Sequence, residues 1–305
     1  MTSEYYHFRL RKAWRDVDDD VSSSYVTIGY ILPSVVANMP WTDKFRVDHG
    51  TRTVSIPWPK ATRGDVSSSY ETQAIAEQLE CARESDSIPI LRKWRTEPYK
   101  ILGLEDRREV RVARSGSAVF GVHTRGVHAL GYRRNNDNNG VKLWISRRSP
   151  TKRTFPGMLD NTVGGGLAAG EDVLGCLARE AQEEASLPEA WVREHAQLVG
   201  TISYFSVRDE RAGGPDEVGL LQPATQTLYD LEMPAGVVPQ PLDGEVAEFL
   251  LWTPEETMTA LREGQFKLNS AVAWIDFLIR HGYITAQNEP DYLELLARIH
   301  RRICF

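Results

Sequence analysis

Residues 165–187 of this 305-residue chain read GGLAAGEDVLGCLAREAQEEASL. The glycines at the start of the stretch favour a loop that approaches a ligand closely, because a residue without a Cβ atom adopts backbone angles that others avoid. Asp172 is a suitable N-cap, and the strong helix formers from Val173 to Ala185 predict the helix that follows it. The stretch therefore predicts a glycine loop that leads into a helix.

Three carboxylates share one face of this predicted helix. Glu180, Glu183 and Glu184 stand at positions i, i+3 and i+4, whereas the opposite face is apolar and can pack into a core. Like charges at this spacing destabilise a helix by roughly 0.2–0.5 kcal/mol a pair, so a compensating partner is expected. Mg²⁺, or Mn²⁺ in its place, is the natural partner because both cations bind carboxylate oxygens. Arg179 can brace one of the carboxylates.

The spacing of these residues resembles the Nudix box. The matching positions in this chain are Gly165, Glu171, Arg179, Glu180, Ala181, Glu183, Glu184, Ser186 and Leu187. Ser186 stands where the family has glycine, which makes the left-handed conformation at the helix end harder to adopt. A solvated acidic helix face is the alternative interpretation, and the glycine loop with Glu171 at its fixed distance argues against it. The resemblance implies an α/β/α sandwich with a mixed sheet.

A wider resemblance covers roughly residues 112–302 and points to one Nudix subfamily with an extra N-terminal domain. The phrases WISRR at 144–148, FPGMLDN at 155–161 and FKLN at 266–269 are among those that carry it. The subfamily includes the Nudix half that is fused to thiamine pyrophosphokinase in some fungi. The resemblance implies hydrolysis of thiamine diphosphate, or of its oxy and oxo derivatives, to the monophosphate and phosphate.

The resemblance also implies a metal site and a catalytic role for the box. Glu180, Glu183 and Glu184 would hold the metal, with Glu171 and the carbonyl of Gly165 or its neighbour Gly164 as lesser ligands. Arg179 would orient Glu180. The metal ions would neutralise the phosphates and activate water.

Substrate-binding residues are expected on both sides of the box. The basic side chains just upstream suit phosphate charge, and the candidates are Arg147, Arg148, Lys152, Glu217 and Glu245. The general base stays open among Glu183, Glu184, Glu217 and Glu245. Trp144 and Phe155 could stack on an aromatic ring, although core packing is the safer expectation.

Other functions remain open on the sequence alone. Nudix enzymes that act on nucleoside diphosphate derivatives such as ADP-ribose share the same chemistry, and a non-catalytic sensor of a diphosphate ligand would keep the same box. Isomerisation of isopentenyl diphosphate is disfavoured because no suitable catalytic cysteine lies near the site, Cys176 being on the box helix itself.

The acidic excess of the chain is confined to its second part. The net charge is −6 overall, and it divides into +1 for residues 1–118 and −7 for residues 119–305. We expect a smaller α+β domain of uncertain role over 1–118 and the Nudix domain over 119–305. The first part predicts strands at Tyr25–Val36 and Thr53–Trp58 and a helix at Tyr70–Arg83, and it shows no catalytic constellation.

Two further patterns predict secondary structure in the second part. The turn residues 135–140 lie between predicted strands at Val127–Tyr132 and Val141–Ile145. Apolar residues at helical spacing predict core-facing helices at Ala271–His281 and from Tyr292 to Ile299.

Composition excludes several classes of protein. Hydrophobic residues make up 41% and charged residues 26%, as in packed soluble domains. No apolar run approaches the roughly 18–20 residues that a membrane span needs, and the acidic charge argues against binding to a nucleic-acid backbone. The Nudix resemblance implies a small-molecule diphosphate as ligand, and a homodimer is compatible with the sequence. Three widely spaced cysteines, Cys81, Cys176 and Cys304, and an acidic N-terminus (Asp18–Asp20) without an apolar leader favour the cytoplasm.

Overall fold

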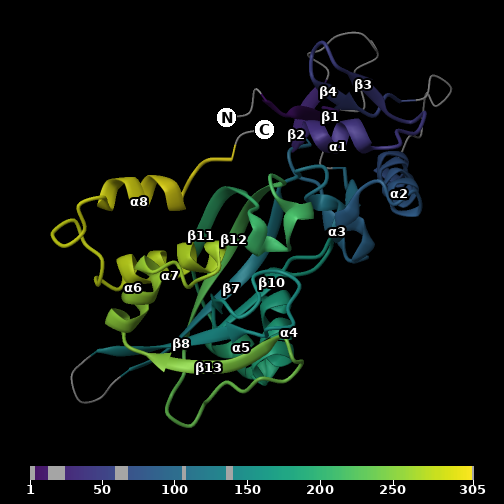
Figure 1. Ribbon diagram of the computed structural model, residues 1–305. Helices are drawn as coiled ribbons and strands as arrows, with labels where there is room; N and C mark the ends of the chain where they lie inside the picture. Colours follow the sequence, from purple (N-terminus) through teal and green to yellow (C-terminus); the bar gives the residue numbers. More distant parts are fainter. Residues whose placement is uncertain (1–3, 13–24, 59–67, 105–107, 135–139, 304–305) are drawn as a thin grey trace.

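The computed structural model describes residues 4–12, 25–58, 68–104, 108–134 and 140–303 and shows two lobes (Figure 1). We name them the N-terminal lobe, up to Val122, and the C-terminal lobe. The predicted turn at 135–139, the acidic run Asp18–Asp20 and Cys304 lie outside the described residues. No helix in the described part of the chain is long and apolar enough to cross a membrane.

The N-terminal lobe is an α+β unit. Its main strands are β1 (Tyr6–Arg11), β2 (Tyr25–Ile31), β3 (Arg46–Asp48) and β4 (Thr53–Ser55). They form one sheet in the order β2-β1-β4-β3. The other elements are α1 (Pro33–Asn38), α2 (Ser68–Glu84), the 3₁₀ helix η3 (Pro89–Arg92), the strand pair β5 (Pro98–Lys100) and β6 (Arg111–Ala113), and α3 (Arg114–Ser117).

The sequence predicted this lobe only in part. The helix expected at Tyr70–Arg83 is confirmed as α2, but the strand expected at Tyr25–Val36 ends at Ile31. The reason is Pro33, which takes the first position of α1; its ring fixes φ near the helical value, and its missing N–H is not needed there. The strand expected at Thr53–Trp58 is paired only over β4.

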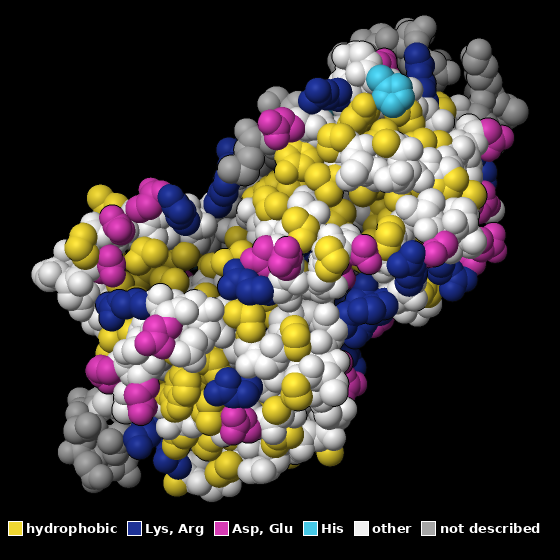
Figure 2. All heavy atoms as spheres, viewed as in Figure 1, with side chains coloured by type: hydrophobic (Ala, Val, Ile, Leu, Met, Phe, Trp, Pro, Cys, Tyr) yellow, Lys and Arg dark blue, Asp and Glu magenta, His cyan; other side chains and the backbone are white. Residues whose placement is uncertain are grey.

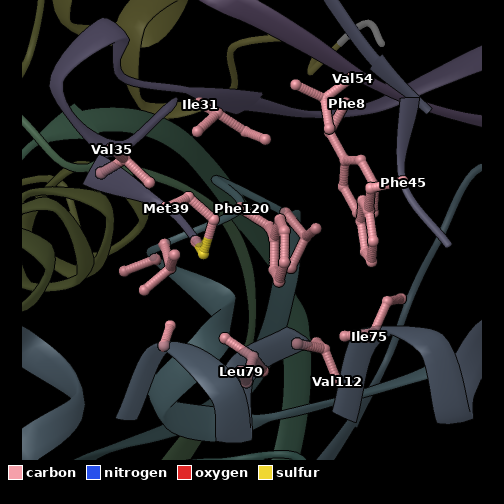
Figure 3. Packing of buried hydrophobic residues seen from close by; sticks show 14 of the residues in the cluster. Phe8, Ile31, Val35, Met39, Phe45, Val54, Ile75, Leu79, Val112 and Phe120 are labelled. Carbon is pink, nitrogen blue, oxygen red and sulfur yellow. The ribbon is translucent and has the colours of Figure 1, made fainter. Parts of the chain in front are cut away.

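The core of the N-terminal lobe is built around aromatic rings. Phe8 stacks on Phe120 with ring centroids 4.8 Å apart, and Phe45 lies 6.1 Å from Phe120 (Figure 3). Ile75 and Leu79 of α2 close this core and are fully buried. Phe120 belongs to the core of the N-terminal lobe. We therefore propose a domain boundary close to Phe120, near the division at residue 118 that the sequence suggested.

The C-terminal lobe contains a mixed sheet. Its strands are β7 (Thr124–Arg134), β8 (Val141–Arg148), β9 (Leu159–Asp160), β10 (Val163–Gly166), β11 (Gln197–Val207), β12 (Leu221–Glu232) and β13 (Val246–Trp252). The order is β11-β12-β7-β8-β13, with β10 on β7 and β9 on β8. Only β12 and β7 run parallel; the other pairs are antiparallel.

Helices cover both faces of this sheet (Figure 1). One apolar core joins the sheet to α4 (Val173–Ala185) and α5 (Glu189–His195). A second core joins it to α6 (Pro254–Arg262) and α7 (Leu268–Arg280). This layering confirms the predicted α/β/α sandwich behind a smaller α+β domain.

The last helix, α8 (Tyr292–Ile299), turns its predicted apolar face inward, with Tyr292, Leu295 and Leu296 half-buried. It lies beyond the edge strand β11 (Figure 1), and only Ile299 is buried. Leu293 is 79% exposed. Leu293 lies outside the predicted face, so the predicted face is the less exposed side of the helix.

Candidate active site

The loop and helix of residues 165–187 adopt the predicted form. Helix α4 spans Val173–Ala185, and the Asp172 carboxylate accepts a hydrogen bond of 2.7 Å from the Gly175 N–H as its N-cap. Ser186 ends the helix in the left-handed conformation with φ of 55°. Its hydroxyl donates to the carbonyl oxygen of Gln240 at 3.0 Å, which helps to hold a conformation that glycine adopts more easily.

Gly165 lets the box helix approach strand β10. A Cβ atom at Gly165 would overlap the side chain of Glu180. The glycine therefore allows this carboxylate to lie directly against the backbone of the loop, where the loop carbonyls are also at hand.

A cavity of about 430 Å³ opens beside this loop and is lined by both lobes. The expected site residues that line it are Arg148, Lys152, Gly164, Gly165, Arg179, Glu180, Glu183, Glu184, Glu217 and Glu245. Two expected residues stand apart from this lining. Arg147 pairs instead with Glu248 at 2.7 Å on the sheet surface, and Glu171 lies behind Arg179.

Arg179 connects three carboxylates of the box. Its guanidinium lies 3.0 Å from an oxygen of each of Glu171, Glu180 and Glu183. Glu171 also accepts a bond from the Ala168 N–H at 3.2 Å, which ties the loop to the helix. Arg179 therefore contacts Glu180, the residue that the resemblance expected it to orient.

Glu184 and Glu180 are carboxyl groups in an enclosed place, which disfavours their charged forms. Burial, and then the charge of Glu180, raise the pKa of Glu184 to about 8, although the Gly164 N–H donates to it at 3.1 Å. Burial also raises the pKa of Glu180, against the opposing effect of Arg179. A divalent cation bound beside these two carboxyl groups would favour their charged forms.

The donor set fits Mg²⁺ or Mn²⁺, which prefer carboxylate and carbonyl oxygens. Glu180, Glu183 and Glu184 would hold the cation, with a loop carbonyl from Gly164 or Gly165. Within the described residues, no three His, Cys, Asp or Glu side chains are already gathered around one point. The ion pairs of Arg179 with Glu180 and Glu183 account for this, because they turn these carboxylates toward the guanidinium.

A second buried network surrounds Asp160, whose partners Arg148 and Lys267 line the cavity. Its carboxylate accepts from Arg148 at 2.6 Å, from Lys267 at 3.3 Å and from the Ser270 hydroxyl. Burial alone would raise the pKa of Asp160, but the charges of Lys267 and Arg148 outweigh it and hold that pKa well below its usual range. Arg148 also donates to the carbonyl of Thr154 at 2.7 Å, so it supports the cavity wall as well as lining it.

The other expected residues occur as ion pairs in the cavity wall. Lys152 pairs with Glu245, and burial, followed by the charge of Arg148, lowers the pKa of Lys152 to about 8. Glu217 is buried and pairs with Arg208 and with Arg153, the latter at 3.4 Å.

Several residues of the cavity wall were missed from the sequence. Arg95, Tyr99 and Arg114 come from the N-terminal lobe, and Tyr204 and Gln226 come from β11 and β12. No motif marks these positions. For Arg95, Tyr99 and Arg114, the sequence signal was the presence of an additional domain ahead of the box.

The histidine and cysteine side chains near the box are poor candidates for catalysis. Burial, and then Lys267, lower the pKa of His128 to about 3, so its ring is neutral. Burial, and then Glu171, raise the pKa of the Cys176 thiol far above its usual range. A thiol held protonated is a weak nucleophile, which agrees with the expectation against isomerase chemistry.

Comparison with known proteins places this architecture in a family. A model of the NUDIX domain matches residues 123–275, half of the chain. The uncharacterized protein YJR142W of Saccharomyces cerevisiae is 38% identical over 72% of this chain and 64% of its own length. Nudix hydrolase 20, chloroplastic, of Arabidopsis thaliana is 37% identical over 63% of this chain and 48% of its own length. Nudix hydrolase 24, chloroplastic, of the same plant is 34% identical over 63% and 50%.

This chain thus spans between about half and two thirds of the length of these relatives. The family model covers the sheet strands β7 to β13 together with the loop and helix that carry the box. The chain therefore belongs to the Nudix family.

Proposed function

We propose that this protein hydrolyses a diphosphate linkage with the help of Mg²⁺, or of Mn²⁺ in its place. The observation that carries the proposal is that the buried carboxyl groups of Glu180 and Glu184 line one cavity together with basic side chains. A bound cation supplies neutralisation of phosphate charge and activation of water. The cavity thus offers sites for both partners of a metal–diphosphate complex.

The residues of the chain divide the remaining tasks. Arg179 holds the orientation of Glu180, and Lys152 faces the cavity with a positive charge that suits phosphate. The general base is Glu184 in this proposal, because the carboxylates of Glu183, Glu217 and Glu245 are already engaged by cationic partners.

We propose thiamine diphosphate, or its oxy and oxo derivatives, as the substrate class. The subfamily phrases in the sequence support this choice. The aromatic side chains of Tyr99, Phe155 and Tyr204 also line the cavity, and a heteroaromatic ring can pack against such side chains.

The test is analysis of phosphate products with Mg²⁺ on a panel of substrates. The panel contains thiamine diphosphate, its oxy and oxo analogues, ADP-ribose, a dinucleoside polyphosphate and isopentenyl diphosphate. Release of a monophosphate from the thiamine compounds, lost in Glu183→Gln, is the expected result. Turnover of ADP-ribose alone would keep the diphosphatase chemistry and contradict the thiamine assignment. Tight binding of one compound without turnover would indicate a sensor.

We also propose that the reaction takes place in the cytoplasm. Cys81 and Cys176 are unpaired in the described part of the chain, which suits a reducing compartment. Imaging of a tagged full-length protein tests this, and a signal confined to an organelle would contradict it.

A further inference from the structure

We propose that the N-terminal lobe binds an anionic group of the substrate through Arg95 and Arg114. The inference rests on the proposed function and assigns that site an additional pair of substrate-binding residues. It gives the N-terminal lobe a direct part in recognition of the diphosphate.

The N-terminal lobe lies against the box itself. The carbonyl oxygen of Pro98 accepts a hydrogen bond of 2.7 Å from the Ala169 N–H. The Tyr99 hydroxyl fills the space where a Cβ atom at Gly166 would be. These contacts join β5 to the glycine loop, so the N-terminal lobe forms a wall of the same cavity that the box carboxylates line.

Backbone contacts hold the two arginines in this wall. The Ser115 hydroxyl accepts from the Arg95 N–H at 2.6 Å and donates to the Lys93 carbonyl at 3.2 Å. The Arg114 N–H donates to the Glu97 carbonyl at 2.8 Å. The wall is therefore formed before any ligand arrives, which lowers the ordering cost of binding.

The two guanidinium groups share a single carboxylate. Glu97 lies 3.4 Å from Arg114 and 4.0 Å from Arg95. Both arginine side chains keep about 40% of their surface exposed, at 41% and 39%. One positive charge of the pair is left without compensation, and it faces the cavity from a solvent-accessible position.

A similar arrangement stands on the neighbouring wall. Arg153 and Arg208 share Glu217, and Arg153 also donates to the carbonyls of Ile90 and Lys93 at 3.1 and 2.5 Å. Basic side chains are visible along the border between the lobes in Figure 2. Four guanidinium groups in this part of the cavity thus have two carboxylates between them.

The charge in the cavity is therefore divided between two sides. The box side carries Glu180, Glu183 and Glu184 against Arg179, and the interlobe side carries the excess of arginine. Arg114 and the box residue Glu180 line the same cavity. A diphosphate between the two sides would meet a cation at the carboxylates and guanidinium groups at its other oxygens.

The test measures binding of inorganic pyrophosphate to the full-length protein by calorimetry, without metal so that the arginines are read directly. We expect Arg114→Gln and Arg95→Gln each to weaken binding about tenfold, the loss of one charge-assisted contact. Glu97→Gln frees both guanidinium groups and should tighten binding several-fold. Arg92→Gln is the matched control, because Arg92 pairs with Asp86 on the exposed surface of the same lobe and should leave binding unchanged.

Opposite signs for the arginine and glutamate variants distinguish recognition from a structural ion pair. Weakening by Glu97→Gln as well would show that the pair only shapes the loop, and would overturn the inference. Wild-type affinity in Arg114→Gln and Arg95→Gln, or no pyrophosphate binding by the wild type, would also overturn it.

The two proposals fail separately. Pyrophosphate binding that depends on the arginines, with no turnover of any diphosphate, would contradict the proposed function and support this inference. If a substrate is turned over, Arg114→Gln should raise its KM about tenfold and leave kcat within about twofold. An unchanged KM in Arg114→Gln would leave the proposed function supported and contradict this inference.

Discussion

At the scale of single residues, Asp160 is the most consequential carboxylate outside the box. It is the shared partner of Arg148 and Lys267, so Asp160→Asn leaves two enclosed cations without compensation. We expect a loss of about 3–5 kcal/mol in the free energy of unfolding, measured by urea denaturation at pH 7. Asp86→Asn, which breaks a solvent-exposed pair, should change it little.

The pH dependence of this loss has a defined sign. Because the folded-state pKa of Asp160 lies below its ordinary value of 3.8, its stabilising effect is complete above that value and disappears as the pH falls toward the folded-state pKa. The difference between wild type and Asp160→Asn should therefore shrink below about pH 4. A difference that stays constant down to pH 2 would contradict this assignment.

Glu184 should behave in the opposite way. Its pKa is raised from 4.5 to about 8 in the folded protein, so ionisation costs stability as the pH rises between these values. In metal-free protein, Glu184→Gln should be more stable than wild type by roughly 1–3 kcal/mol at pH 8 and by much less at pH 5. Thermal unfolding at both pH values measures this. Glu183→Gln is the control, since Glu183 is half exposed, and equal effects of the two substitutions would contradict the account.

The residues of the box could be predicted as a site from the sequence because they lie close together in the chain. Glu180, Glu183 and Glu184 share a helix face by helical geometry alone. The pairing of Asp160 with Lys267 spans 107 residues and follows from the packing of β9 beside α7, so spacing in the chain carried no sign of it. Both residues were within the quoted phrases, but without a role.

At the scale of elements, the box helix begins at a cap that can be tested alone. Asp172→Ala removes the acceptor of the Gly175 N–H and should lower stability by about 1 kcal/mol. Asp172→Asn keeps an acceptor and should lie within a few tenths of a kcal/mol of wild type. Chemical denaturation of the three proteins is the measurement, and equal losses in both variants would point to the charge instead of the cap.

The elements predicted best were those with both a start signal and a periodic pattern. Helix α4 has a cap, helix formers and one apolar face, and its bounds match the prediction. Strand β2 was predicted too long because an apolar run continues through Pro33 into α1. Helix α8 shows the periodic pattern without a side-chain cap, and its predicted apolar face is the less exposed one.

At the scale of the whole molecule, the contact between the lobes depends on Gly166. A Cβ atom there would overlap the Tyr99 hydroxyl, so Gly166→Ala should lower stability by about 1–3 kcal/mol through overpacking. Adding Tyr99→Phe removes the overlapping oxygen and should restore part of the loss. Gly236→Ala is the control, because a Cβ atom there meets nothing within 4 Å. Strictly additive losses in the double variant would contradict this view of the interface.

The arrangement of the two lobes could not be predicted from the sequence. Composition and the charge division indicated two parts, and the resemblance indicated an extra domain of uncertain role. The placement of Tyr99 on Gly166 and of Arg114 near Glu180 arises from tertiary packing between distant segments. A cavity built by two domains leaves no local pattern in either of them.

The central claim is that the box carboxylates hold a divalent cation beside a diphosphate site. Mn²⁺ titration followed by electron paramagnetic resonance tests it most directly, in wild type, Glu180→Gln and Glu184→Gln, with Glu248→Gln on the sheet surface as control. We expect the box substitutions to weaken Mn²⁺ binding at least about tenfold, since each removes a charged ligand, and the control to bind as wild type does. Equal Mn²⁺ affinity in all four proteins would contradict the claim.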